Sequence, residues 1–543
     1  MMMWPTKKLK VIVILVIILE NILLLGCLAK RPNFLFVISD DMRLINPFED
    51  ELNAMPSIQA FARGTRGTRG GAFFTNAHSQ MAMCSPSRSS LMSGLRPDST
   101  KLYQINSVMR KSKTKITTIA EALKKSGYRT IGVGKIMDGR VSGGWQVQDF
   151  PLSWSQRVNN TKSAAWDKNL TMPNCGYGDA RFHPKTNKKP FTQCAFRPDV
   201  RIPRAKIRVP SRDGLPDYDL LQVALDTLDD LSKKPDEPFF LAVGLLRPHL
   251  PFVAPQSHFA RWPREIFTNH TQYPYHPFRD DVYQPPLYRN REFSTYTGWT
   301  IKAKKPGPLA GVNRHARAVH SYIAACSMVD EVFDSLVAAL DSKPPEIRDN
   351  TVVIFFSDHG YHLGEHGIYG KKTVYEAATR VPLLIMGSMF SNMVRVDSPV
   401  ELIDLMPTIM QLAQVTDQAP SPLGYQGISL LPLFESSQPV KKVKAVALAQ
   451  FYGFNGYGKL MSYAFRGSRY RFVVHYRTVQ KKILFSELYD YKTDPRELTN
   501  LLTDPTVDTS HIAPKFHALF RLYLDDMNEY HHAISQDLLD EDF

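Results

Sequence analysis

The sequence predicts an α/β protein with a large doubly wound mixed sheet flanked by helices, and a smaller antiparallel sheet near the C-terminus. Short apolar runs alternate with helix-like apolar spacing through most of the 543 residues. This alternation is typical of strand-helix units that place helices on both faces of a parallel sheet. After about residue 435, Tyr, Phe and Val gather in short runs that indicate antiparallel strands. We therefore expect a leader at residues 1–29, a main domain at 30–438 and a smaller subdomain at 439–543.

Four apolar runs predict strands of the main domain: Phe34–Ile38, Phe239–Gly244, Val352–Phe356 and Val381–Ile385. Leucines at helical spacing between Leu221 and Leu231, and apolar residues between Val329 and Leu340, predict helices that cover this sheet. In the subdomain we expect a strand at Tyr470–His475 and a helix around Phe516–Met527.

The composition excludes several classes of protein. Hydrophobic residues make up 43% of the chain, which is enough to build a core, so a disordered or fibrous protein is excluded. Five cysteines are too few for a disulfide scaffold. The net charge of +15 favours a polyanionic partner, which would be a nucleic acid, an anionic membrane or a sulfated or phosphorylated polymer.

The first thirty residues have the pattern of a secretory signal peptide. Lysines at positions 7, 8 and 10 precede an apolar run at 11–19, and the small-residue ending Cys27-Leu28-Ala29 follows. An uncleaved membrane anchor is the alternative, but Glu20 would be costly at the centre of a permanent span. We expect cleavage, no stable membrane span afterwards, and a destination in the lysosome or outside the cell.

Entry into the secretory pathway would permit two further modifications. Asn159, Asn169 and Asn269 each begin an Asn-x-Thr acceptor for N-glycosylation. Cys175 and Cys194 bracket a stretch rich in Gly, Pro and Lys, where a disulfide would hold a loop that has few apolar anchors. Free thiols are the alternative at these two positions.

Acidic residues follow two of the predicted strands. Asp40-Asp41 comes at the end of the first strand, and Asp358-His359 follows the strand at Val352–Phe356. Ligands in doubly wound folds bind beyond the carboxyl ends of the strands, so we expect these side chains at one edge. Three carboxylates with few nitrogen ligands suit a hard cation, Ca²⁺ or Mg²⁺. The alternative is that each pair is only a turn or a helix cap.

A third motif lies between these two pairs. Cys84-Ser-Pro-Ser-Arg88, followed by Met92-Ser93-Gly94, resembles the CxPSR motif of the sulfatase family, although such a cysteine could also be a buried structural thiol. The resemblance covers nearly all of the chain after the leader and implies an alkaline-phosphatase-like fold. It also implies that a formylglycine-generating enzyme oxidises Cys84 to formylglycine, an aldehyde whose hydrate is the nucleophile.

Within that family the chain is most similar to the iduronate-2-sulfatase clade. The segments that carry this likeness are Arg31–Val37, Ser93–Asp98, Arg247–Phe252, Gly364–Gly367, Lys371, Arg380–Leu384 and Glu487–Leu501. The resemblance implies an enzyme that hydrolyses the 2-O-sulfate of uronic acids in glycosaminoglycans such as heparan sulfate and dermatan sulfate. Its partner would then be a sulfated polysaccharide or oligosaccharide, and not a nucleic acid.

The same resemblance implies a role for each site residue in a catalytic domain at 30–438. The ligands of one Ca²⁺ would be Asp40, Asp41, Asp358, His359 and the formylglycine at Cys84. The side chains that neutralise the sulfate and the nucleophile would be Arg88, Lys135 and Lys371. The leaving alcohol would receive its proton from His249.

Two positions depart from the family pattern. Family members usually carry a His three residues past the Lys that corresponds to Lys135, and this His is thought to accept a proton as sulfate is eliminated. The present chain has Asp138 there, which could replace it as the base. The clade's substrate-reading turn, of the Gln-Tyr-Pro-Arg type, is here Gln450-Phe451-Tyr452-Gly453 and lacks the Arg.

Other functions compete with this interpretation. A catalytically weak protein of the sulfatase fold that binds sulfated glycans would account for Asp138 and the net charge of +15. A sulfatase for a different sulfated carbohydrate would account for the missing Arg. A phosphate-ester hydrolase on the related alkaline-phosphatase fold is disfavoured, because such enzymes use an unmodified Ser or Thr and a pair of zinc ions.

Overall fold

The computed structural model describes residues 30–139, 149–156, 158, 215–250, 252, 254–268, 273, 292–293, 308–415, 424–434, 442–455 and 458–535. The expected signal peptide, the pair Cys175 and Cys194, and the acceptors Asn159, Asn169 and Asn269 lie outside these residues and stay predictions. Within the described ranges, no helix combines the length and the apolar character that crossing a bilayer requires.

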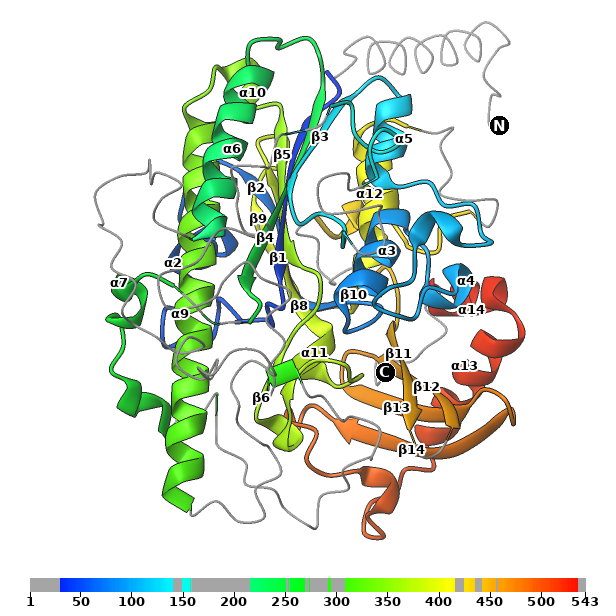
Figure 1. Cartoon of the computed structure of the whole chain (residues 1–543). Helices are drawn as coiled ribbons and strands as arrows, with labels where there is room; N and C mark the ends of the chain where they lie inside the picture. Colours follow the sequence, from blue (N-terminus) through cyan, green and yellow to red (C-terminus); the bar gives the residue numbers. More distant parts are fainter. Residues whose placement is uncertain are drawn as a thin grey trace, which may run out of the picture.

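A large mixed sheet of eight strands forms the centre of the protein (Figure 1). Its strands run in the order β10-β2-β8-β5-β1-β4-β3, and β9 pairs with β2. β1 is parallel to both β4 and β5, and β3 is parallel to β4, whereas β8 is antiparallel to β2 and β5. The bounds are β1 Asn33–Asp40, β2 Gly70–His78, β3 Arg129–Gly134, β4 Phe239–Pro248, β5 Thr351–Ser357, β8 Arg380–Gly387, β9 Met393–Val396 and β10 Val400–Glu401. The four strands expected from apolar runs are therefore confirmed.

Helices cover both faces of this sheet, as the doubly wound prediction requires (Figure 1). One face carries α2 (Pro56–Ala62), α6 (Pro216–Leu231) and α9 (Pro308–Asp341), and the other carries α3 (Cys84–Ser93), α5 (Ile119–Lys125) and α12 (Leu405–Leu412). Strand β1 shows how the two cores arise from one run. Leu35 and Val37 point into the first core, while Phe34, Phe36 and Ile38 point into the second, because successive side chains of a strand alternate between faces.

A separate four-stranded antiparallel sheet follows in the chain. Its strands are β11 (Ala447–Asn455), β12 (Gly458–Arg466), β13 (Tyr470–Arg477) and β14 (Lys482–Asp490), paired in that order. Helices α13 (Ala513–Asp525) and α14 (Met527–Ser535) pack on one face, where Phe516 stacks on Phe472 at 5.3 Å between ring centroids. The expected strand at Tyr470–His475 is confirmed. The expected final helix is two helices, because α13 ends before Met527 and α14 begins there.

Glu401, the last residue of β10, ties the two sheets together. Its carboxylate accepts hydrogen bonds from Arg96 at 2.6 and 2.8 Å, from Lys444 Nζ at 2.7 Å and from the backbone N–H of Leu448 at 3.1 Å. Arg96 precedes α4 (Pro97–Thr100), and Leu448 lies on β11. Since all of these groups are buried, removing one charged partner would cost about 3–5 kcal/mol.

Asp98 on α4 forms a second junction between the two sheets. Its carboxylate accepts hydrogen bonds from the hydroxyls of Tyr103, Tyr463 and Tyr523 at 2.7, 2.9 and 2.9 Å, and from Gln450 Nε2 at 3.1 Å. Tyr463 lies on β12, Tyr523 on α13 and Gln450 on β11. Four donors from different segments therefore meet on one carboxylate.

Asp330 on α9 caps the start of α2 on the other side of the protein. Its two carboxylate oxygens accept the backbone N–H groups of Ser57 at 3.0 Å and Ile58 at 2.8 Å. Burial raises the pKa of Asp330 from 3.8 to about 6, and the nearby charge of Asp334 acts in the same direction. Because the folded pKa lies above the unfolded one, the folded chain holds a proton that the unfolded chain releases. The stabilisation from this group is therefore present at low pH and is lost as the pH rises towards 6.

We predict that Asp330→Asn removes this part of the pH dependence. Relative to the parent, the free energy of unfolding of the variant should rise by about 3 kcal/mol between acidic and neutral pH, since about two pKa units separate the folded and unfolded states of Asp330. Urea unfolding of both proteins across this range measures the difference. A difference that stays constant with pH would contradict the argument.

Candidate active site

The carboxyl ends of four neighbouring strands carry the predicted site residues. In the sheet register Asp40 of β1 lies opposite Pro248 of β4, and Ser39 lies opposite Ser357 of β5. Because these strands are parallel, His249 after β4 and Asp358-His359 after β5 emerge at the edge where β1 ends. Lys135 follows β3 at the same edge, after Gly134, whose φ of +76° is unfavourable for other residues. A Cβ at Gly134 would also lie only 2.2 Å from the carbonyl oxygen of Gly244.

The turn after β1 lets two consecutive aspartates serve one site. Asp40 is the last residue of the strand, and Asp41 takes a left-handed conformation with φ of +68°. The backbone N–H of Asp41 donates to Asp358 Oδ1 at 3.1 Å, and that of Met42 donates to Ser357 Oγ at 2.8 Å. Because the strand ends at Asp40, the carboxylates of Asp40 and Asp41 do not have to point to opposite faces of the sheet, as consecutive side chains within a strand would.

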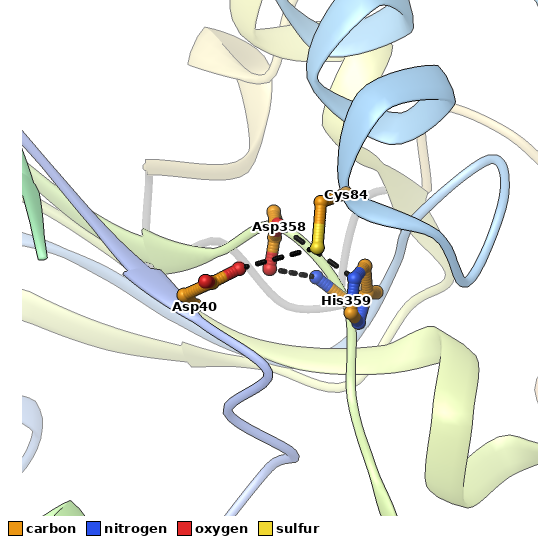
Figure 2. Close-up of side chains that lie close together, drawn as sticks. All are labelled: Asp40, Cys84, Asp358 and His359. Carbon is orange, nitrogen blue, oxygen red and sulfur yellow. Dashed lines mark hydrogen bonds and ion pairs between the residues drawn. The ribbon is translucent and has the colours of Figure 1, made fainter. Parts of the chain in front are cut away.

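Four buried side chains form a group that could hold a metal ion (Figure 2). One ligand atom from each of Asp40, Cys84, Asp358 and His359 lies within 4.8 Å of the others, and Asp41 and His249 form a second such group with Asp40 and Cys84. His359 Nδ1 lies 3.0 Å from the carbonyl oxygen of Gly360, so Nδ1 carries the proton. Nε2 then presents a lone pair, and this buried atom has no hydrogen-bond partner among the described residues. The donor set, mainly carboxylate oxygens, fits a hard divalent cation.

Cys84 is the first residue of α3 and only 1% exposed. Its Sγ lies 3.5 Å from Asp40 Oδ1 and 3.5 Å from Lys371 Nζ. Burial, together with the negative charge of Asp40, raises the pKa of the thiol well above its ordinary value. The unmodified side chain therefore stays protonated near neutral pH and is a poor nucleophile.

Three buried cations face the aspartates. Lys135 Nζ donates to Asp40 Oδ2 at 2.5 Å, and Lys371 Nζ donates to the two oxygens of Asp41 at 2.6 and 2.8 Å. Arg88 reaches Asp358 Oδ2 at 2.9 Å and Asp40 Oδ1 at 3.3 Å. Burial alone would raise the pKa of Asp40, but Lys135, with smaller contributions from His249, Arg88 and Lys371, holds it well below its usual range.

Arg88 has a second set of contacts, because its guanidinium also donates to the backbone carbonyls of Lys135 and Ile136. It thus joins α3 to the ends of β1, β3 and β5. Arg88 therefore holds Asp40 and Asp358 in place. This role is additional to the sulfate contact that the sequence predicts.

His249 lies at the edge of this cluster and is partly exposed. Its Nδ1 lies 2.7 Å from the carbonyl oxygen of Leu250, while Nε2 faces Asp41 Oδ2 at 3.8 Å and Glu292 Oε1 at 3.3 Å. Burial acts to lower its pKa, but Asp41 and other acidic neighbours outweigh this effect and raise it. The ring therefore keeps its proton to higher pH than an ordinary imidazole, which suits a proton donor.

Sequence reasoning missed Glu292. Its carboxylate contacts His249 and lies 3.6 Å from Lys371 Nζ. Burial opposes its ionisation, but the positive charge of Lys371 and the hydrogen bond with His249 lower its pKa. No motif or periodic pattern surrounds Glu292 in the sequence, so no signal distinguished it from other surface acids.

The two departures from the family pattern occupy different places. Asp138 is fully buried, and its charge helps to raise the pKa of Lys135 against the effect of burial. It therefore lies on the Lys135 side of the cluster. Gln450 of β11 is buried and bonded to Asp98, and the backbone N–H of Gln450 donates to the carbonyl oxygen of Gln80 at 2.8 Å, four residues before Cys84.

The mixed sheet flanked by helices has the alkaline-phosphatase-like fold that the resemblance to sulfatases implies, and the carboxylates and the buried cysteine lie at its strand ends. The family model described as "Sulfatase" matches residues 32–415, and the model of the N-sulphoglucosamine sulphohydrolase C-terminal region matches residues 364–520. The chain belongs to the sulfatase family, and its activity is the hydrolysis of sulfate esters.

Individual relatives support this assignment. A sulfatase of Formosa agariphila is 27% identical over 489 residues, which cover 87% of this chain and 83% of the relative. Human iduronate 2-sulfatase is 29% identical over 417 residues, 74% of this chain and 70% of the relative. Among solved structures, a 2-O GAG sulfatase aligns with a TM-score of 0.60 at 21% identity, covering 93% of this chain and 94% of that one, and so supports the fold.

We predict that Asp138 accepts a proton during turnover. Asp138→Asn should then give a rapid burst of alcohol product followed by turnover at least about a hundredfold slower, because an amide cannot act as a base. Asp138→His, which restores the family's residue, should keep steady turnover. Pre-steady-state kinetics with a chromogenic sulfate ester measures both phases. Steady turnover by Asp138→Asn at the parent's rate would show that another group is the base.

Proposed function

We propose that this sulfatase removes the 2-O-sulfate of uronic acid residues in glycosaminoglycans, using formylglycine formed from Cys84 and one Ca²⁺. The observation that carries the proposal is the convergence of Cys84, Asp40, Asp358 and His359 in one buried group. When present, formylglycine and the cation supply a hydroxyl nucleophile and polarise the sulfate.

The chain's own residues would prepare the site for that chemistry. Asp40, Asp41, Asp358 and His359 would hold the cation. Lys135 and Lys371 flank the Cys84 position and offset the negative charge that develops on the sulfate and the nucleophile. The same two lysines already offset the negative charges of Asp40 and Asp41.

His249 would deliver a proton to the oxygen of the leaving alcohol. Its raised pKa keeps it protonated at mildly acidic pH, and its Nδ1 contact with the Leu250 carbonyl orients the ring so that Nε2 faces the cluster. Glu292 stabilises the charged ring through its contact with Nε2.

The choice of substrate rests on the relatives and on charge. Human iduronate 2-sulfatase is among the relatives, and a net charge of +15 suits a polyanionic glycan. The turn at Gln450-Phe451-Tyr452-Gly453, which lacks an Arg, instead favours a second candidate: a sulfatase for a different sulfated sugar. Release of sulfate from a panel of defined disaccharides that differ in sulfate position distinguishes the two.

We predict that active protein contains formylglycine at position 84. Mass spectrometry of the peptide that spans Cys84 should show the aldehyde when the protein is produced with the formylglycine-generating enzyme. Cys84→Ala should lose at least about a thousandfold in kcat, as expected for removal of a nucleophile. Cys326→Ala, at the other buried free thiol among the described residues, is the matched control and should keep its activity. Unmodified thiol throughout a fully active preparation would overturn the prediction.

Removal of the metal is a separate prediction. Chelation should abolish activity and added Ca²⁺ should restore it, because without the cation nothing bound by the carboxylates polarises the sulfate. Asp358→Ala should stay inactive at any Ca²⁺ concentration. Asp236→Ala, at a fully exposed carboxylate, should behave like the parent. Full activity after exhaustive chelation would mean that the acidic pairs are structural.

A further inference from the structure

The turn that carries Asp41 is held from outside the motifs by Tyr322. This residue lies on α9 and is fully buried. Its hydroxyl donates a hydrogen bond to the carbonyl oxygen of Asp41 at 2.7 Å and accepts one from the backbone N–H of Arg43 at 2.8 Å. One side-chain atom therefore bridges both ends of the left-handed turn.

The ring of Tyr322 is fixed by aromatic packing, so its hydroxyl has little freedom to move. Tyr361 stacks on it with 5.8 Å between ring centroids, and Phe252 contacts it edge-on at 5.3 Å. All three side chains are buried in the core between α9 and the sheet. The packed side chain of Tyr322 thus attaches the turn to α9, the longest helix of the described structure.

A second contact, between Arg43 and Glu365, also holds this turn. Arg43 Nη1 lies 2.5 Å from Oε1 of Glu365, and the other oxygen of Glu365 accepts the backbone N–H of Leu363 at 2.7 Å. Burial would raise the pKa of Glu365, but Arg43 lowers it to about 2, so the pair stays charged. Glu365 lies between β6 (His362–Leu363) and β7 (Tyr369–Gly370).

The hairpin formed by β6 and β7 leads directly to Lys371, which bonds the carboxylate of Asp41. Tyr322 therefore fixes the backbone of Asp41. Lys371, which follows the hairpin, fixes the carboxylate of Asp41. The ion pair between Arg43 and Glu365 connects this hairpin to the turn. A left-handed backbone is uncommon for residues with a Cβ, although Asp adopts it more readily than most, and the contacts of Tyr322 hold Asp41 in this conformation.

We propose that Tyr322 and the Arg43–Glu365 pair are positioning residues that preset the Asp41 turn for a divalent cation. The inference rests on the cation of the proposed function. It adds residues that hold the turn and are not among the proposed metal ligands. Tyr322 and Arg43 lie outside the motifs quoted from the sequence, whereas Glu365 lies in the segment Gly364–Gly367. Partners of metal ligands commonly change metal affinity by about 10–100-fold when they are removed.

The test is the affinity of the full-length protein for Ca²⁺ alone, measured by calorimetry after chelator treatment. Tyr322→Phe removes one oxygen and keeps the ring, and it should raise the dissociation constant about tenfold. Tyr361→Phe makes the same chemical change on the adjacent stacked ring and should bind Ca²⁺ like the parent. At saturating Ca²⁺ the kcat of Tyr322→Phe should return to near that of the parent.

A merely structural role would give a different pattern. It would lower the melting temperature of Tyr322→Phe equally with chelator and with Ca²⁺, and it would leave the dissociation constant unchanged, which would overturn the inference. Should Tyr322→Phe fail to fold by circular dichroism, Glu365→Gln carries the test. This variant weakens the tie to Arg43 and should also raise the dissociation constant.

The outcome for the parent separates this inference from the proposed function. A parent that binds Ca²⁺, with both variants unchanged, rejects only the positioning role. A parent that binds no Ca²⁺ rejects the cation of the proposed function and the positioning role together.

Discussion

An ionised carboxylate loses several kcal/mol of solvation on burial, and one edge of the large sheet buries three of them. Lys135, Arg88 and Lys371 make this edge possible, because each places a buried positive charge against an aspartate. The neighbouring strands and helices place these positive charges beside the aspartates. β3 ends so that Lys135 turns inward, α3 lies where Arg88 reaches the ends of β1, β3 and β5, and Lys371 follows the β6–β7 hairpin.

Much of this arrangement was predictable because it follows from local sequence. The strand at Phe34–Ile38 is a continuous apolar run that stops at an acidic pair, and the strand before Asp358 repeats the pattern. Parallel strands place such ends at the same edge of the sheet, and the two ends meet here because β1 and β5 are neighbours. The sulfatase motif then located Cys84 and Arg88, and the structure brings them to the same edge.

Other features depend on pairings that no local pattern encodes. Strand β2, which begins Gly70-Gly71, has a weak strand signal, yet it lies beside β8 inside the sheet, where the register shifts at a bulge. Glu292 and Tyr322 contact the site from segments that resemble ordinary surface and core sequence. Their importance comes from contacts between distant parts of the chain: Glu292 contacts His249 and Lys371, and Tyr322 contacts Asp41, 281 positions away.

The complete burial of α3 constrains when Cys84 can be modified. All ten residues of this helix are buried, and the thiol is enclosed by the sheet edge, Lys371 and Asp40. A modifying enzyme must place its own catalytic groups against Sγ, and the packed helix leaves no room for them. The proposed oxidation of Cys84 would therefore compete with folding, and the rate at which α3 packs against the sheet would set the time available. A molecule that folds before this modification would retain its thiol, so the active fraction of a preparation would depend on how many molecules were modified before they folded.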